Sequence, residues 1–496
     1  MKIGLSKFSL LLYLNLKFKY FTNHPIFYWA LFGMILRYLF GLYTSDSNDV
    51  EVWYRTGLSI LYGLDVYERA YFAYPPVWGY ILGFFVKIGG LILDSRDFAR
   101  NVLELKSLFL ITGNVSTTIT SPTFNFIFKT PLFIADLLIG YILYKFVLEL
   151  TQNIKKAKTA FLLWFFNPLV IIVSAIHGTF DVIATLFTLL VVILIYKKNY
   201  FLGGAMWMFG ILTKLFPIYF MPLLIGVILS MIFCNSANIF EKFKKIVRNL
   251  SWFIFGAIFA FVTILVPILY LKTLENATGV FRIVETGVGV GGISPWFIRY
   301  IPEYRWILNW AYNNTHIILK YSNIIELSFL SVVGTIAFLL GYRNPAKALS
   351  YGSVATLSIV YLTAPFVWYQ YLIWMIPFLI VVSMVFESKY RYILTIITYS
   401  GLLFYFSLMN IWHLMLPLAV YTNILNVDSI ISATQIFWME KGIINVYLRD
   451  DLKLVSCLFG VLGIILCLFP RNISYLYIIK ESIFEIKKLL KLGGFK

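Results

Sequence analysis

The sequence predicts an all-α polytopic membrane protein with about twelve transmembrane helices. Of the 496 residues, 60% are hydrophobic and only 13% are charged, and the mean hydropathy is +0.83. A soluble domain of this size carries roughly twice that charged fraction. Apolar runs long enough to cross about 30 Å of hydrocarbon recur along the chain. Because no internal repeat or low-complexity linker interrupts them, we expect a single integral-membrane domain over 1–496.

Positive charge marks one side of this predicted domain. Lysine and arginine collect in short segments between apolar runs and at both chain ends, and the positive-inside rule places such segments in the cytoplasm. The internal basic segments are 155–158, 197–198, 242–248, 343–347 and 389–391. The predicted spans are then 26–43, 126–148, 159–176, 180–196, 200–216, 217–233, 249–271, 323–341, 350–366, 371–386, 391–409 and 452–469. Both ends of the chain are expected inside the cell.

One apolar segment, 75–93, does not fit this count. If it crossed the bilayer, every later basic segment would move to the outer side. We therefore expect 75–93 to be re-entrant or interfacial, although a short extra crossing within 103–113 would also restore the charge pattern. The first outer loop is then 44–125 and contains amphipathic helices. A second large outer loop covers 272–322, and 471–496 is a basic cytoplasmic tail.

Composition and motifs also exclude several function classes. The net charge of +18 comes from the short loops between spans, so topology explains it and a nucleic-acid partner is not expected. The chain has no Walker A loop, no dinucleotide fingerprint and no Cys/His spacing typical of a metal site. We expect neither a cofactor nor a resident metal.

The first outer loop begins with three carboxylates, Asp46, Asp49 and Glu51. A carboxylate beside the membrane can act as a general base and remove a proton from an attacking hydroxyl. Burial against Trp53 and Tyr54 would raise its pKa toward a useful range. The structural alternative is an Asp N-cap that opens an amphipathic helix after Asp49.

A second polar segment follows Asn167-Pro168, where the proline predicts a broken or kinked helix. His177 could donate a hydrogen bond to a phosphate or a sugar, and Asp181 could orient its ring. The alternative is that Thr179 or Asp181 caps the next span. We expect both His177 and Asp181 on the outer side.

Further candidates are cations and one amide. Lys214 lies at the outer end of a span, against the positive-inside bias, where it could pair with a lipid phosphate. Arg282 in the second outer loop could add a bidentate contact. Gln370 could hydrogen-bond a sugar, although its aromatic neighbours are typical of a membrane interface.

Several short motifs occur in one order along 44–380. They are Asp49-Val50-Glu51, then Gly63, Tyr67 and Arg69, then Tyr74-Pro75-Pro76, Asn167-Pro168-Leu169, His177 with Asp181, Lys214 with Pro217, Ser294-Pro295-Trp296, and Gln370-Tyr371 with Trp374. Through this ordered set of motifs the chain resembles the GT-C polyprenyl-phosphate-sugar glycosyltransferases, most closely the catalytic subunit of GPI mannosyltransferase I and its archaeal relatives. The sequence departs from that pattern in three places. Ser47 stands in the family's Asp-x-Asp, His177 replaces an arginine, and the glycine-rich 287–292 replaces a basic run before Ser294-Pro295.

The resemblance implies a membrane hexosyltransferase that inverts the sugar. It would move a hexose, with mannose as the expected one, from a dolichyl- or polyprenyl-phosphate sugar to a glycan or glycolipid acceptor on the extracytoplasmic side of a multi-pass plasma-membrane protein. The implied catalytic residues are Asp49, with Asp46 as the alternative base and Glu51 as a partner. The implied substrate-binding residues are Arg69, Tyr74, His177, Asp181, Lys214, Arg282 and Gln370. Metal dependence is expected to be weak or absent, and a small companion subunit is compatible with this assignment.

A multi-span transporter or lipid flippase is the main alternative. Transporters usually carry ionisable residues near the bilayer midplane and show repeated halves. Here the polar residues collect at the outer rim. Asp136 is the carboxylate well inside a span, and a hydrogen bond between helices explains it. A non-catalytic scaffold subunit leaves the outer polar residues without a role.

Overall fold

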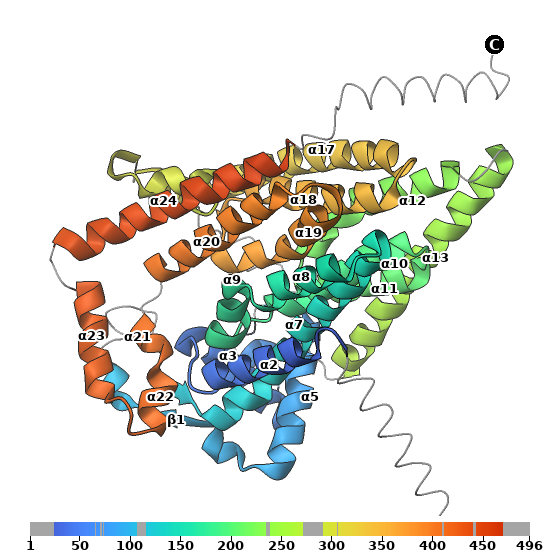
Figure 1. Ribbon diagram of the computed structural model, residues 1–496. Helices are drawn as coiled ribbons and strands as arrows, with labels where there is room; N and C mark the ends of the chain where they lie inside the picture. Colours follow the sequence, from blue (N-terminus) through green and yellow to red (C-terminus); the bar gives the residue numbers. More distant parts are fainter. Residues whose placement is uncertain are drawn as a thin grey trace, which may run out of the picture.

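The computed structural model describes residues 24–64, 66–69, 72, 74–106, 116–234, 239–270, 291–304, 306–408, 411–439 and 443–469. Helices make up most of this part of the chain (Figure 1). The strands within it are short and form two pairs. β1 (Ala99–Asn101) runs antiparallel to β2 (Thr118–Thr120), and β3 (Gly291–Gly292) runs parallel to β4 (Phe366–Val367).

Five helical segments are long and apolar enough to cross a membrane. They are α7 (Pro122–Thr151), η4 with α12 (Phe216–Cys234), most of α13 (Ile239–Tyr270), most of α17 (Thr315–Gly341), and η7 with α19 and η8 (Tyr369–Phe386). A sixth is the bent pair formed by α8 (Ile154–Phe165) and by α9 with η3 (Pro168–His177). The protein is therefore a helical integral membrane protein.

The predicted number of twelve spans is not confirmed. Within the described residues, four apolar helices are shorter than 18 residues and do not count as candidate spans by length. They are α2 (Phe27–Gly41), α5 (Pro76–Ile92), α10 (Asp181–Tyr196) and α11 (Tyr200–Ile211). Hydropathy identified these segments as apolar, but helix length depends on where turns and caps end each segment.

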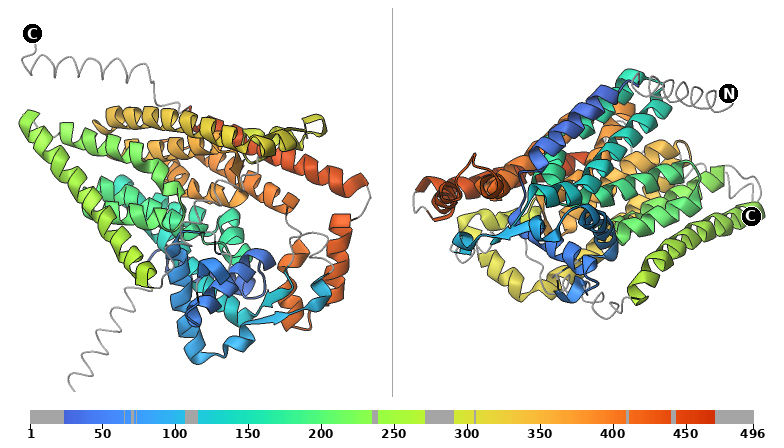
Figure 2. Two further views of the ribbon diagram at one scale, coloured as in Figure 1. Left: turned by 180° about the vertical axis from the view of Figure 1, so that it is seen from behind. Right: turned by 90° about the horizontal axis from the view of Figure 1, so that it is seen from below.

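The remaining elements connect or cover these helices. They are α3 (Ser47–Leu61), α4 (Val66–Arg69), η1 (Ser95–Phe98), η2 (Leu103–Leu105), η5 (Pro295–Tyr300), η6 (Pro302–Tyr304), α16 (Trp306–Asn313), α18 (Pro345–Thr363), α20 (Tyr390–Leu408), α21 (Ile411–Leu414), α22 (Leu416–Tyr421), α23 (Val427–Met439) and α24 (Ile443–Cys467). Figures 1 and 2 show α3, α5 and β1 on the side of the bundle away from α17 and α24. The predicted tail 471–496 lies outside the described residues, as does most of 103–113.

The segment 44–125, which was expected to form the first outer loop, contains helices, and the first of them begins earlier than expected. α3 starts at Ser47 because the Asp46 side chain accepts hydrogen bonds from the backbone N–H groups of Asn48 and Asp49. One face of α3, which includes Val50 and Trp53, is buried. α5 packs against α3 and α7, so this loop is held against the bundle.

The Asn167-Pro168 break is confirmed. The helices before and after it differ in direction by 42°. The Asn167 side chain caps the second segment by accepting from the N–H groups of Leu169 and Val170. The helix-to-helix role of Asp136 is confirmed as well, because its carboxylate accepts hydrogen bonds from Arg37 on α2 at 2.9 Å and from Ser174 on η3 at 2.5 Å.

Glycines allow α11 and α13 to cross at close range. A Cβ atom on Gly204 would lie 1.9 Å from the Phe253 carbonyl oxygen, and one on Gly256 would lie 1.9 Å from that of Phe201. Such small-residue crossings are common between membrane helices. We expect Gly204→Ala to lower the free energy of unfolding by about 2 kcal/mol, because the backbones must separate.

The measurement is a denaturant titration of the purified full-length protein in mixed micelles. Gly90→Ala is the matched control, because a Cβ atom there meets only the Leu61 side chain, at 3.4 Å. Its stability should be unchanged or slightly raised by the better helix propensity of alanine. Equal stability of the two variants would rule out a close crossing at Gly204.

Candidate functional site

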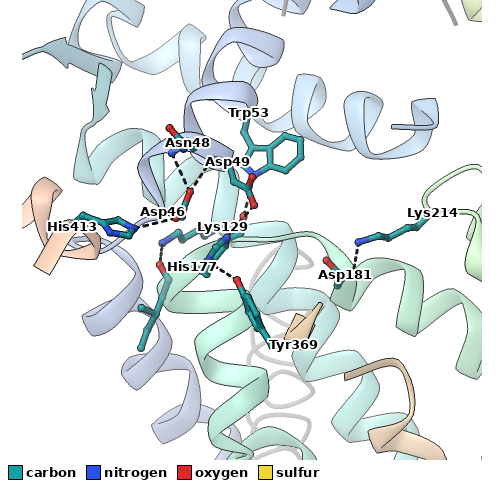
Figure 3. A network of polar contacts seen from close by, with 12 residues as sticks. Asp46, Asn48, Asp49, Trp53, Lys129, His177, Asp181, Lys214, Tyr369 and His413 are labelled. Atoms are coloured by element: carbon teal, nitrogen blue, oxygen red, sulfur yellow. Dashed lines mark hydrogen bonds and ion pairs between the residues drawn. The ribbon is translucent and has the colours of Figure 1, made fainter. Parts of the chain in front are cut away.

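Polar side chains from six separate segments meet beside the ends of the helices. They come from the start of α3, the first turns of α7, the end of η3, the start of α10, the turn after α11, and η7 (Figure 3). We refer to Asp46, Asp49, His177, Asp181 and Lys214 as the polar cluster. All five were predicted from the sequence as site residues.

Asp49 and His177 form the exposed edge of the polar cluster. The His177 Nε2 atom lies 3.0 Å from Asp49 Oδ2, and its Nδ1 atom lies 3.0 Å from the Tyr369 hydroxyl. An ionised carboxylate only accepts, so Nε2 donates to Asp49. Nδ1 accepts from the Tyr369 hydroxyl when the ring is neutral and donates to it when the ring is protonated. The His177 side chain is buried, whereas that of Asp49 is 42% exposed. Asp49 can therefore meet a ligand from outside.

Asp46 is a buried helix cap. Its Oδ1 atom accepts the N–H groups of Asn48 at 3.1 Å and Asp49 at 3.0 Å, and its Oδ2 atom lies 3.2 Å from His413 Nε2. Burial alone would raise the pKa of this carboxyl, but the nearby His177 and His413 hold the pKa well below its usual range. A carboxylate so fully engaged is poorly suited to remove a proton.

Lys129 on α7 holds the surrounding backbone together. Its ammonium is fully buried and donates to the carbonyl oxygens of Gly41 at 3.0 Å, Thr44 at 2.5 Å and Ala175 at 2.7 Å, with Ile176 at 3.3 Å. These carbonyls belong to the end of α2, the segment before α3, and η3. Lys129 thereby fixes the distance between the Asp46–Asp49 segment and His177.

Lys214 and Asp181 form a second buried pair. Lys214 Nζ donates to Asp181 Oδ1 at 2.6 Å, and Trp374 Nε1 donates to the same oxygen at 2.9 Å. The ammonium lies 4.6 Å from the ring centre of Tyr371 and 5.3 Å from that of Trp374, within cation–π range. The expectation that Asp181 orients His177 is wrong, because the Asp181 carboxylate is bound by Lys214 and Trp374.

One oxygen of this pair has no partner. Asp181 Oδ2 is buried and accepts no hydrogen bond within the described part of the chain. An unsatisfied buried acceptor costs about 1–3 kcal/mol. Burial raises the pKa of the Tyr74 hydroxyl well above its usual value, and the negative charges of Asp49 and Asp181 raise it further. The charges of Asp49 and Asp181 therefore both act on Tyr74.

The other predicted site residues lie apart from the polar cluster or outside the described residues. Glu51 accepts from Arg55 one turn along α3, at 2.8 Å from Nε, so it is a surface ion pair and not a partner of Asp49. Gln370 is half-buried in η7. Arg69 ends α4, but its side chain lies outside the described residues, as does all of Arg282.

Three of these residues could hold a metal ion. Ligand atoms of Asp46, Asp49 and His177 all lie within 4.8 Å of one another. Each of these side chains already takes part in a hydrogen bond, to the α3 backbone, to His413 or to Tyr369. An ion would have to displace some of those contacts.

Four residues that complete the arrangement were missed from the sequence. Lys129 is a lysine inside a predicted span, which is by itself a signal of function or structure. Tyr369 and Trp374 were assigned to an aromatic belt, and His413 was not singled out although the chain has only four histidines. Their partners lie 46 to 367 residues away in the sequence, so no local pattern identifies these contacts.

The fold and the polar cluster define a class of protein. It is a helical membrane protein with a site beside the helix ends, rich in hydrogen-bond acceptors and aromatic rings and holding the buried ammonium groups of Lys129 and Lys214. Residues 60–281, less than half of the chain, match the family model of the GPI transamidase subunit PIG-U. This segment includes Lys129, His177, Asp181 and Lys214. No curated protein matches the chain.

The match corrects the expectations drawn from resemblance. PIG-U is a different membrane protein family from the catalytic subunit of GPI mannosyltransferase I, so the assignment to polyprenyl-phosphate-sugar glycosyltransferases is wrong. The predicted hexosyltransferase activity, the polyprenyl-phosphate sugar donor and the glycan or glycolipid acceptor of a sugar transfer are therefore wrong as well. Each motif behind the resemblance comprises a few residues, and aromatic residues at the interface and prolines in the helices are common in membrane proteins generally.

Proposed function

We propose that this chain is a lipid-recognising subunit of a membrane complex of the GPI transamidase type. In this role it binds the head group of a glycosylphosphatidylinositol-type lipid and presents it to other subunits, without itself transferring a group. The observation that supports the proposal most directly is that one cluster holds both an unsatisfied carboxylate oxygen, on Asp181, and an exposed carboxylate, on Asp49.

The chemistry of such a head group suits the polar cluster. Its sugar and inositol hydroxyls can donate to Asp49 and to Asp181 Oδ2. Tyr74 and Tyr371 offer ring faces for a sugar, and Lys214 supplies a cation for a phosphate. Similarity to the GPI transamidase subunit over residues 60–281 supports the same class of lipid.

We also propose that the polar cluster lies on the non-cytoplasmic side. The first turns of α7 and α10 contribute Lys129 and Asp181, while the opposite ends of these helices lead to the basic segments 155–158 and 197–198. Positive-inside topology supports this orientation. If the shorter apolar helices also cross the membrane, the number of crossings approaches the predicted twelve.

Binding to Asp49 gives the first test. The probe is glucosaminyl-phosphatidylinositol, added to the purified full-length protein in phosphatidylcholine nanodiscs. We expect Asp49→Asn to weaken binding about tenfold, because a hydrogen bond to a charged acceptor becomes one to a neutral amide. Binding is measured by thermophoresis.

Glu51→Gln is the matched control, since it removes a carboxylate from the same helix that is paired with Arg55. Its affinity should equal that of the wild type. The proposal is overturned if the wild type binds phosphatidylinositol as tightly as the glucosaminyl lipid, or if Asp49→Asn binds as well as Glu51→Gln.

A further inference from the structure

A cavity of about 620 Å³ lies at the other end of the helix bundle from the polar cluster. Its lining comes from the last turn of α7, the end of α10, the end of α12 and the turn between α17 and α18. These are ends opposite to those that carry Lys129 and Asp181. The cavity is therefore separate from the polar cluster, and a ligand bound in it is independent of the proposed function.

The ends of the candidate spans indicate the depth of this cavity in the membrane. Three of them end beside it, at Thr151, Cys234 and Gly341. Where several apolar spans end together, the surrounding medium changes from hydrocarbon to lipid head groups. A ligand in this cavity would thus be at head-group depth, with Met231 and Tyr196 toward the apolar side.

The lining is basic. Among the described residues, it contains Lys197, Lys198 and Arg343 and a single carboxylate, Glu149. Lys197 pairs with Glu149 at 3.1 Å, and both side chains are about half exposed. Lys198 and Arg343 add two further cationic side chains to the lining. Lys198 has a left-handed backbone conformation with φ of 58°, which ends α10 and brings consecutive lysines to the cavity.

We propose that this basic cavity binds the phosphate of an anionic membrane phospholipid. Lys198 and Arg343 contact the phosphate oxygens, the acyl chains stay in the bilayer, and Lys197 exchanges between Glu149 and the lipid. Basic pockets between transmembrane helices are a recurrent form of anionic-lipid site, with about 1 kcal/mol from each cation near the surface. A membrane lipid is favoured over a free anion because the cavity lies where the spans end.

The test uses the full-length protein in detergent with added phosphatidylglycerol, and it measures lipid binding by native mass spectrometry. We expect the double variant Lys198→Gln with Arg343→Gln to weaken binding about thirtyfold. The matched control is Lys155→Gln with Lys156→Gln, which removes the same charge from exposed positions on α8. The control should change binding less than threefold.

A second variant keeps the test decisive if the double variant does not fold. Glu149→Gln removes the competing carboxylate and should tighten phosphatidylglycerol binding about fivefold. The proposal is overturned if the control weakens binding as much as the double variant, if phosphatidylcholine binds equally well, or if inorganic phosphate at millimolar concentration displaces the lipid completely.

Discussion

Lys129→Met is expected to lower the free energy of unfolding by about 3 kcal/mol or more. The Lys129 ammonium is buried and serves four carbonyl oxygens from three separate segments. Methionine fills a similar volume but donates nothing, so these carbonyls lose a charged donor in a place that water does not reach. Each buried acceptor left unsatisfied costs about 1–3 kcal/mol, and partial relaxation reduces the sum.

Lys145→Met, on the same helix, is the control for this prediction. Lys145 is exposed, and its ammonium lies 5.9 Å from the Tyr141 ring centre. Its replacement should change stability by less than about 1 kcal/mol. Denaturant titration in mixed micelles measures both variants. Equal stabilities would mean that Lys129 does not join α2, the segment before α3, and η3.

The second large effect concerns the Lys214–Asp181 pair. Lys214→Met is expected to cost about 3–5 kcal/mol, because it leaves the Asp181 carboxylate buried without its counter-ion. Adding Asp181→Asn to this variant should recover most of the loss, since the double variant has no buried charge at this place. The signature is therefore a double variant that is more stable than the Lys214→Met single variant.

Lys197→Met is the control for an ion pair of the same chemistry at the surface. Lys197 pairs with Glu149 at 3.1 Å, but both side chains are about half exposed, so the loss should stay below about 1 kcal/mol. A double-mutant cycle on Asp181 and Lys214 measures the coupling free energy directly. If the double variant is the least stable protein of the cycle, the interaction is not a mutually dependent buried pair.

The fold class could be predicted because it depends on average properties of long segments. Hydropathy identified α7, α13 and α17 as membrane helices, and proline chemistry located the break at Asn167-Pro168. The number of spans could not be predicted in the same way. α10 and α11 are apolar throughout, but caps and turns end them after 16 and 12 residues.

The members of the polar cluster could be predicted, but their pairings could not. Topology indicated that Asp49, His177, Asp181 and Lys214 face the same side of the membrane. It did not show which carboxylate pairs with His177. Asp181 is the near neighbour in sequence, but the structure brings Asp49 to 3.0 Å from the His177 ring. The Asp46 carboxylate was treated as a candidate base, whereas local backbone geometry uses it as a helix cap.

The sequence by itself determined that this protein is a helical membrane protein and that the carboxylates, histidine and lysine of the polar cluster gather at one end of the helices. Both follow from the cost of leaving backbone or charged groups in hydrocarbon, a property of each segment alone. Only the tertiary structure decided which charge neutralises which. Lys129, Tyr369 and His413 reach their partners across 46 to 367 residues, and a hydrogen bond depends on distances of a few tenths of an ångström that arise only when the helices pack.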